Sequence, residues 1–188
     1  RGIGHTTARL FLDRGWQIIT CSRDDTPEEC KRDPNWTCHI PTDLGDADSL
    51  AQFIETANEE LADAPLHALV NNAAHSIRRP ILEALDRIHD YERTMQLNYI
   101  GAVRMTMGLI PRFLAQGRGQ VVNASTLSAQ VPIPLFSAYL ASKSALESFT
   151  RSLEAEMGHQ GVSTTVVYFP MVRTPMSSRT AIYKYMPM

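Results

Sequence analysis

The sequence predicts an α/β fold, a doubly wound parallel sheet between two layers of helices. Short apolar runs alternate along the chain with stretches of helical periodicity, and the spacing between runs is long enough for crossover helices. A glycine-rich turn, Gly2-Ile3-Gly4, precedes the first helical stretch. With 188 residues and 44% hydrophobic side chains, the chain has enough apolar material for one core. We therefore expect a single domain over residues 1–188.

Each expected element follows from its local pattern. Helices have apolar residues at three- and four-residue spacing, and the first of them ends at Gly15. Strands are short apolar runs bounded by polar or turn residues. In chain order we expect a helix over 6–15, a strand over 16–23, a weaker strand over 37–41, a helix over 48–62, a strand over 66–70, helical structure over 90–115, a strand over 120–123, a helix over 137–157 and a strand over 163–168.

Both ends of the sequence suggest a longer natural polypeptide. The chain opens on the second half of a glycine-rich turn, and the strand that precedes such a turn is central in a doubly wound sheet. Residues 175–188 end the chain as an unpaired segment. We expect a further strand and turn before Arg1, and more chain after Met188.

Composition excludes several classes of function. A formal net charge of -2 without a Lys/Arg-rich run argues against nucleic acid or an anionic membrane as a partner. No apolar stretch approaches the roughly 20 residues of a membrane span, and no signal-peptide pattern is present. Cys21, Cys30 and Cys38 lack disulfide or zinc spacing, which favours a reducing cytoplasm. The sequence has neither a Gly-x-Ser-x-Gly elbow nor a His-Glu-x-x-His motif, so a hydrolase and a zinc site are disfavoured.

Tyr139 and Lys143 are the most informative pair of residues. Residues four apart lie on one face of a helix, so the Lys143 ammonium can favour the ionised form of the Tyr139 phenol. A phenol tuned in this way exchanges a proton near neutral pH. Reduction of a carbonyl, or oxidation of an alcohol, needs such a group beside a hydride carrier.

The glycine-rich turn and Arg23 point to a dinucleotide. Glycines before a helix allow a pyrophosphate to approach the free N–H groups of the first turn, although a simple helix-entry turn has the same pattern. Arg23 follows the strand after which such folds recognise the adenosine ribose, and no acidic residue occupies position 21 or 22. A guanidinium there suits a 2′-phosphate, with Arg1 as a second cation, and favours NADPH. The alternative is a solvated arginine that Asp24 and Asp25 partly neutralise.

Two further features are ambiguous when each is judged alone. The small residues of Asn71-Asn72-Ala73-Ala74 suit a cofactor passing close to a strand end, or a plain turn. Asn98 falls inside a helical stretch, where it would hold water, kink the helix, or face solvent.

Taken in order, these motifs resemble the classical short-chain dehydrogenase/reductase family, which has a Rossmann-like fold, over essentially the whole chain. The resemblance implies that Tyr139 is the proton donor, that Lys143 lowers its pKa and holds the nicotinamide ribose, and that Asn98 supports a water relay. It implies contacts with the cofactor at Arg1, Gly2, Ile3, Gly4, Arg23, Asp43, Leu44, Asn71, Ala73, Tyr139, Lys143, Pro170, Val172 and Thr174.

Two positions depart from the family pattern. The hydroxyl expected thirteen residues before the tyrosine falls on Thr126, where the family usually has serine. Threonine keeps the donor and narrows the pocket, while Ser125 could substitute if the backbone shifts. Phe169-Pro170 replaces the usual Pro-Gly, and because proline has no N–H, one backbone contact to the cofactor is in doubt. Thr174 remains placed for the carboxamide.

A narrower resemblance concerns the substrate. Residues 76–79, 86–99, 172–176 and 180–183 are similar to the reductase domain of bacterial fatty acyl-coenzyme A reductases. This implies that Arg78 and Arg79 could meet a phosphate or an acyl-carrier surface; salt bridges to Glu83 or Asp86 are the alternative. The methionines Met171 and Met176 would line an acyl channel or belong to the core.

The sequence therefore predicts an NADPH-dependent reductase of a fatty acyl thioester or of the corresponding aldehyde. A reductase or dehydrogenase of another substrate, such as a 3-oxoacyl thioester, a steroid or a small ketone, is the nearest alternative. A non-catalytic dinucleotide-binding sensor is a more distant one. The apolar residues of the 137–157 helix favour a homodimer or homotetramer, although one face of that helix must cover the sheet.

Overall fold

The structure, a computed structural model, describes residues 2–131 and 133–178, and the chain divides into two compact units. One unit comprises residues 2–62 and 171–178 of the described chain, and the other lies within 63–170. Arg1 and residues 180–183, which the sequence analysis singled out, lie outside the described residues.

The first unit is built on two parallel strands, β1 (Ile18–Ser22) and β2 (Trp36–Pro41). Trp36 is buried with Leu12 and Cys30, and its indole N–H donates to the Thr20 hydroxyl at 2.8 Å. Asp46 caps the second helix by accepting from the backbone N–H of Ser49 at 2.7 Å. The helices of this unit are α1 (Gly2–Leu12), α2 (Ala47–Leu61) and α6 (Pro175–Ser178).

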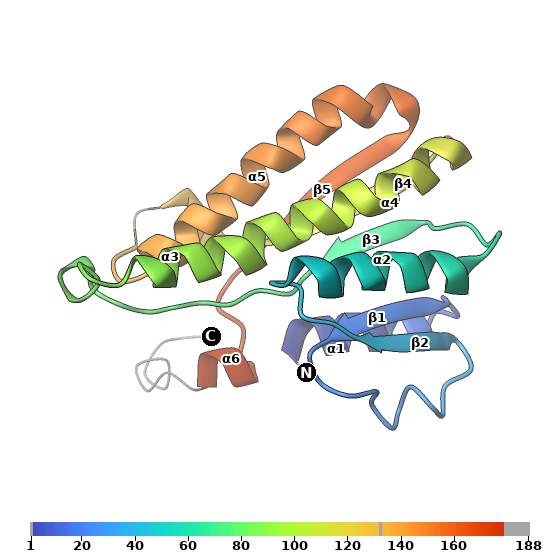
Figure 1. The fold of residues 1–188 in the computed structure, drawn as a ribbon, viewed down its shortest axis with the longest axis horizontal. Helices are drawn as coiled ribbons and strands as arrows, with labels where there is room; N and C mark the ends of the chain where they lie inside the picture. Colours follow the sequence, from blue (N-terminus) through green and yellow to red (C-terminus); the bar gives the residue numbers. More distant parts are fainter. Residues whose placement is uncertain (1, 132, 179–188) are drawn as a thin grey trace. The chain divides into compact units, whose positions relative to one another are not determined.

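The second unit contains a parallel sheet in the order β3 (Ala68–Asn71), β4 (Gly119–Thr126) and β5 (Val162–Phe169). Two long helices, α4 (Ala102–Gln116) and α5 (Ser137–Met157), pack against β4 and contact each other (Figure 1). Central strands of a parallel sheet bury apolar side chains, and the core of this unit joins the two helices to β4 and β5. Its fully or nearly buried members are Ile110, Phe113, Val121, Leu153 and Val162.

Two glycines fix the start of β4 and β5. Gly119 donates from its N–H to the carbonyl of Gly161 at 3.0 Å, and a Cβ on Gly119 would lie 2.2 Å from the Phe113 ring. Gly161 has φ +84°, and a Cβ there would lie 2.0 Å from the Gly117 carbonyl oxygen. Only glycine permits this approach, so the two strands begin at one defined register.

A π-turn interrupts the long helical stretch before α4. The stretch begins with α3 (Ile88–Met95), widens over Gln96–Gly101 and continues as α4, and Figure 1 shows the three parts as one rod. A π-turn inserts one extra residue into a helical turn and is frequent at functional sites. Here the inserted turn contains Asn98, which is 1% exposed.

The strands and long helices expected from the sequence are confirmed, and α5 has the predicted bounds. The first helix is a correction, because α1 ends at Leu12 rather than at Gly15. Gly15, with φ +76°, closes a turn by donating its N–H to the Leu12 carbonyl at 2.8 Å. The glycines expected to form a turn before the helix instead form the first residues of α1. Short 3-10 turns over Ile81–Glu83, Leu127–Gln130 and Gly158–Gln160 were not predicted.

Candidate active site

The expected acid and its lysine lie one turn apart at the start of α5. Tyr139 is half-buried, whereas Lys143 is only 2% exposed. The ammonium of Lys143 donates to the carbonyl of Ala124 on β4 at 2.6 Å. Burial lowers the pKa of Lys143 from 10.5 to about 8. The lysine is therefore anchored to the sheet and is still mostly charged at neutral pH, one helical turn after the phenol.

Asn98 ties the π-turn to α5 and to the segment after β3. Its amide group donates to the Ser142 hydroxyl at 2.9 Å and to the His75 carbonyl at 2.8 Å, while its oxygen accepts from the His75 N–H at 2.7 Å. The Ser142 hydroxyl in turn donates to the carbonyl of Tyr139 at 2.7 Å. A solvent-facing Asn98, one of the alternatives, is wrong, and the amide links the helix turn that carries the tyrosine to two other segments.

Ser125 and Thr126 end β4 in different environments. The Ser125 hydroxyl is buried and donates to the carboxylate of Glu147 at 2.8 Å. Thr126 is half-buried, and its hydroxyl oxygen accepts from the N–H of Ser128 at 3.2 Å. An accepting hydroxyl retains its own proton to donate. Thr126 therefore has a proton to offer a substrate oxygen, whereas the proton of Ser125 is already engaged.

Glu147 is a buried carboxylate that the sequence analysis missed. It is 3% exposed and accepts from the Gln130 amide at 3.0 Å and the Tyr168 hydroxyl at 3.2 Å, besides Ser125. Burial, with Glu147 nearby, raises the pKa of Tyr168. The sequence contains one indication of its role. Glu147 is four residues after Lys143, so both side chains lie on the same, inward face of α5.

Asn71 ends β3 inside a chain of polar contacts. Its amide donates to the Asn123 oxygen at 2.8 Å and to the Thr106 hydroxyl at 3.1 Å. The amide of Asn123 then donates to the Thr150 hydroxyl on α5 at 2.8 Å. Asn71 is thus part of a network that links strands and helices, rather than only of a turn. Ala73 follows it and is exposed, as is Pro170 at the end of β5.

In the first unit, some of the expected cofactor residues lie together. A Cβ on Gly2 would meet the Thr174 side chain at 3.6 Å, so these two residues are neighbours. Arg23 and Asp43 follow the carboxyl ends of the parallel strands β1 and β2, which the Thr42 N–H and Ser22 carbonyl join at 2.7 Å. Arg23 and Asp43 are exposed, and Asp43 accepts from the N–H of Gly45. Ile3 and Gly4 lie in the first turn of α1, Leu44 is half-buried and Val172 is exposed.

The described cysteines offer no reactive thiolate. Burial raises the pKa of Cys21 and Cys38 to about 11, so these thiols are not ionised at neutral pH. Residues 2–131 and 133–178 contain no group of three His, Cys, Asp or Glu side chains that could hold a metal. Over the same residues, every helix is too short or too polar to cross a membrane. Met176 is 50% exposed, so its assignment to the core is wrong.

Comparisons with known proteins agree with this arrangement. The fatty acyl-CoA reductase of Acinetobacter baylyi is 40% identical over 191 residues, which cover 99% of this chain and 64% of that protein. A fatty acyl-CoA reductase of Mycobacterium tuberculosis is 37% identical over 192 residues, with 99% and 65% covered. A short-chain dehydrogenase structure from Streptomyces avermitilis superposes with a TM-score of 0.84 at 25% identity, over 93% of this chain and 65% of that one.

The chain thus spans just under two thirds of the length of these proteins, and its parallel strands and helices have the Rossmann fold of the solved relatives. Residues 1–182 match the family of short chain dehydrogenases. The chain therefore belongs to the short-chain dehydrogenase/reductase family.

Proposed function

We propose that the protein reduces a fatty acyl-CoA thioester, or the corresponding fatty aldehyde, with NADPH. The observation that carries the proposal is the buried Lys143, anchored on β4 one turn after the half-buried Tyr139. A charged lysine in that place favours the phenolate and so makes Tyr139 a proton donor of suitable strength.

The side chains divide the reaction among them. NADPH, when bound, would supply a hydride for the carbonyl carbon of the substrate. Tyr139 gives its proton to the carbonyl oxygen, and Thr126 donates a hydrogen bond to the same oxygen and holds it. From a thioester the product is a hemithioacetal, which releases the thiol of coenzyme A and leaves an aldehyde. Lys143 lowers the pKa of the Tyr139 phenol and so makes the transfer of its proton easier.

The first unit has features that suit a dinucleotide. Gly2 has φ +66° and begins α1, so the first N–H groups of this helix have no helical partner and suit a pyrophosphate. Arg23 is exposed just after β1 and suits the 2′-phosphate of NADPH. Replacing Arg23 with Ala should lower kcat/KM for NADPH at least tenfold relative to NADH. An unchanged preference would remove the argument for NADPH.

The substrate class rests on the similarity to fatty acyl-CoA reductases. Another carbonyl substrate, such as a 3-oxoacyl thioester, remains the second candidate, because the proton donor serves any carbonyl. A panel of acyl-CoAs, fatty aldehydes, ketones and 3-oxoacyl thioesters, each with NADPH and with NADH, separates the two.

The decisive test is Tyr139→Phe in the full-length protein. This change removes one hydroxyl, keeps Lys143, and should lower kcat by at least 10²-fold while the cofactor still binds. Tyr99→Phe, on the π-turn, is the matched control and should turn over at the parent rate. Reduction by Tyr139→Phe at the parent rate would refute the assignment, and a parent protein that binds cofactor but turns over no carbonyl would be the non-catalytic sensor.

We also propose that the protein acts in the cytoplasm as a homodimer or homotetramer. Leu146 and Leu153, two of the apolar residues on α5, are buried within the second unit and so cover the sheet. Met107 on α4 is 59% exposed and is a candidate for a subunit contact. Sedimentation of the full-length protein tests the assembly.

A further inference from the structure

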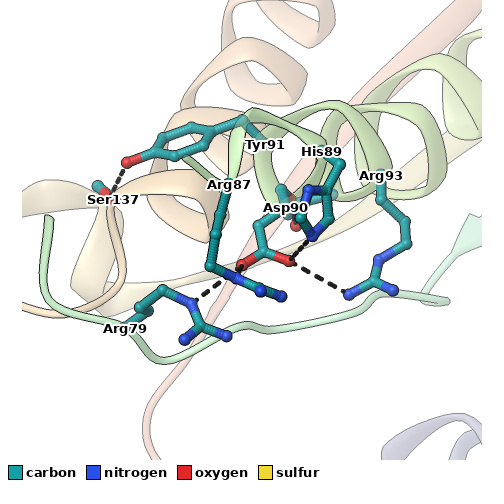
Figure 2. Close-up of polar contacts among 8 residues, drawn as sticks. Arg79, Arg87, His89, Asp90, Tyr91, Arg93 and Ser137 are labelled. Carbon is teal, nitrogen blue, oxygen red and sulfur yellow. Dashed lines mark hydrogen bonds and ion pairs between the residues drawn. The ribbon is translucent and has the colours of Figure 1, made fainter. Parts of the chain in front are cut away.

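A cluster of basic side chains surrounds one buried carboxylate in the second unit. Asp90, on α3, is 3% exposed. Its Oδ2 accepts from the Nε of Arg79 at 3.0 Å and the Nε of Arg87 at 3.1 Å. Its Oδ1 lies 3.5 Å from a guanidinium nitrogen of Arg93 and 3.5 Å from Nε2 of His89. Figure 2 shows the carboxylate of Asp90 among these four side chains.

The cluster has more positive than negative charge. Hydrogen bonds from Arg87, followed by Arg79, hold the pKa of Asp90 below its usual value despite burial, so it contributes one negative charge. Three guanidinium groups against this one carboxylate leave a surplus of two positive charges among these four side chains. In the described chain, Glu83 and Asp86 form no ion pair, so the alternative of salt bridges from Arg78 or Arg79 to these two residues is wrong, and Arg79 pairs with Asp90.

The arginines are fixed in place and still have donors to offer. Arg79 and Arg87 each contact Asp90 through Nε, and the described chain places no partner on their Nη atoms. Their side chains are 31% and 36% exposed, and that of Arg93 is 64% exposed. Asp90 thus orients three guanidinium groups that remain open to solvent. A phosphate group is anionic and has several oxygens that accept hydrogen bonds from guanidinium groups, so it is the ligand that such an arrangement suits.

The cluster lies beside the start of α5, where Tyr139 stands. Arg79 donates its backbone N–H to the carbonyl of Leu135 at 2.7 Å. The hydroxyl of Tyr91, the neighbour of Asp90, bonds that of Ser137 at 2.7 Å, as Figure 2 shows. Ser137 precedes the proposed proton donor by two residues. A substrate whose carbonyl reaches Tyr139 would therefore extend over this side of the second unit.

We propose that Arg79, Arg87 and Arg93 bind the phosphate groups of the coenzyme A part of the substrate. This inference rests on the proposed function, since it names the part of an acyl-CoA that this surface recognises. Coenzyme A carries phosphates at the far end of its pantetheine arm from the thioester, so its phosphate site must lie apart from the reacting carbonyl. A free fatty aldehyde has no phosphate and does not use the cluster.

Arg93→Gln in the full-length protein is the first test. Arg93 is the most exposed of the three arginines and has the longest contact with Asp90, so its loss should leave the fold intact. Titration with unacylated coenzyme A should show at least tenfold weaker binding, and KM for an acyl-CoA should rise by a similar factor. The kinetics of a fatty aldehyde should stay within twofold. Arg104→Gln, an exposed arginine on α4, is the matched control and should change neither.

A second variant guards against a small effect of the single change. Arg87→Gln combined with Arg93→Gln should weaken binding of coenzyme A further, with folding checked by circular dichroism. Parent-like binding of coenzyme A by a folded double variant would overturn the proposal, as would an equal loss for acyl-CoA and aldehyde. Arginine-dependent binding of anionic phospholipid vesicles, with coenzyme A unaffected, would assign the surface to a membrane instead and also overturn it.

Separate experiments test the arginine cluster and the proton donor, so a negative result for one does not count against the other. Titration with coenzyme A needs no turnover, so it reports on the arginines even if Tyr139→Phe proves as active as the parent. Conversely, loss of aldehyde reduction in Tyr139→Phe supports the proton donor whether or not the arginines bind phosphate.

Discussion

Ser125 and Glu147 are joined by a hydrogen bond of 2.8 Å from the serine hydroxyl to Oε1 of the glutamate, in the buried layer between β4 and α5. The next residue, Thr126, ends β4 and is only half-buried, and its hydroxyl accepts from the N–H of Ser128 instead of binding the glutamate. The hydrogen bond to Glu147 therefore distinguishes the hydroxyl of Ser125 from that of Thr126, which the sequence alone could not do. One maintains the packing of α5 on the sheet, and the other is available for chemistry.

Substitutions at these two positions should have opposite effects. Thr126→Val, which removes the hydroxyl and keeps the shape, should lower kcat by about 10²-fold or more with little change in the free energy of unfolding. Ser125→Ala should keep kcat within a few-fold but lower the free energy of unfolding by about 1–3 kcal/mol, because a buried carboxylate oxygen loses a donor. Steady-state kinetics and urea unfolding measure the two quantities. Thr126→Ser is the control for position 126 and should remain active; a loss of kcat in Ser125→Ala alone would reverse the assignment.

Lys143 should make stability depend on pH in the alkaline range. Its pKa is about 8 in the folded chain and 10.5 in the reference state, so between these values the unfolded chain binds a proton that the folded chain lacks. Stability conferred by this group therefore rises with pH through that window. Relative to Lys143→Met, the cofactor-free parent should gain roughly 2 kcal/mol of unfolding free energy from about pH 7.5 to about pH 10. Urea unfolding of both proteins tests this; a constant difference would mean that the ammonium is not desolvated.

Asn98 should be required for stability as well as for turnover. Asn98→Ala removes the hydrogen bonds of this amide with the N–H and carbonyl of His75 and with the Ser142 hydroxyl, and should cost about 2–4 kcal/mol of unfolding free energy. Because Ser142 bonds the carbonyl of Tyr139, kcat should also fall. Asn58→Ala, which removes a half-buried amide on α2, is the control and should cost about 1 kcal/mol or less. Equal losses in the two variants would show that the network has no special role.

The approach of Gly161 to Gly117 predicts a steric effect remote from the site. Gly161→Ala would bring a Cβ to 2.0 Å from the backbone carbonyl oxygen of Gly117. This clash comes in addition to the strain of a positive φ, and the substitution should lower the free energy of unfolding by about 2–4 kcal/mol. Gly15→Ala, at φ +76° with no atom within 4 Å, isolates the strain alone and should cost about 1 kcal/mol. Thermal unfolding measures both, and KM should not change in either. A cost for Gly161→Ala no larger than that for Gly15→Ala would mean that the turn relaxes freely.

Local patterns predicted the elements well where one period governs a whole segment. The helix over 137–157 is recovered with its bounds, because helical periodicity holds over the whole segment. The π-turn over Gln96–Gly101 was not predicted, since it depends on contacts of Asn98 with His75 and Ser142, residues 23 and 44 positions away. When contacts with residues far away in the sequence change the helical period, a short stretch of sequence gives little indication of that change.

The residues of the candidate site could be predicted only where a local pattern fixes their relation. Tyr139 and Lys143 were predictable because four-residue spacing on a helix fixes their relation. Asp90 was not singled out, because Arg79 is 11 residues away and reaches it through a loop whose course no local pattern describes. The role of Glu147 depends in the same way on where the end of β4 meets α5.

The extra residue in the turn around Asn98 is a local bulge in one rod. A π-turn accommodates its added residue within a single widened turn, so α3 and α4 continue in line on either side of it. Removing one residue from Gln96–Gly101 would return this turn to α-helical hydrogen bonding and move its side chains relative to His75 and Ser142. The amide bridge to α5 would be lost, whereas the apolar core of the unit would keep all of its residues, so the bulge serves the placement of one side chain rather than the cohesion of the core.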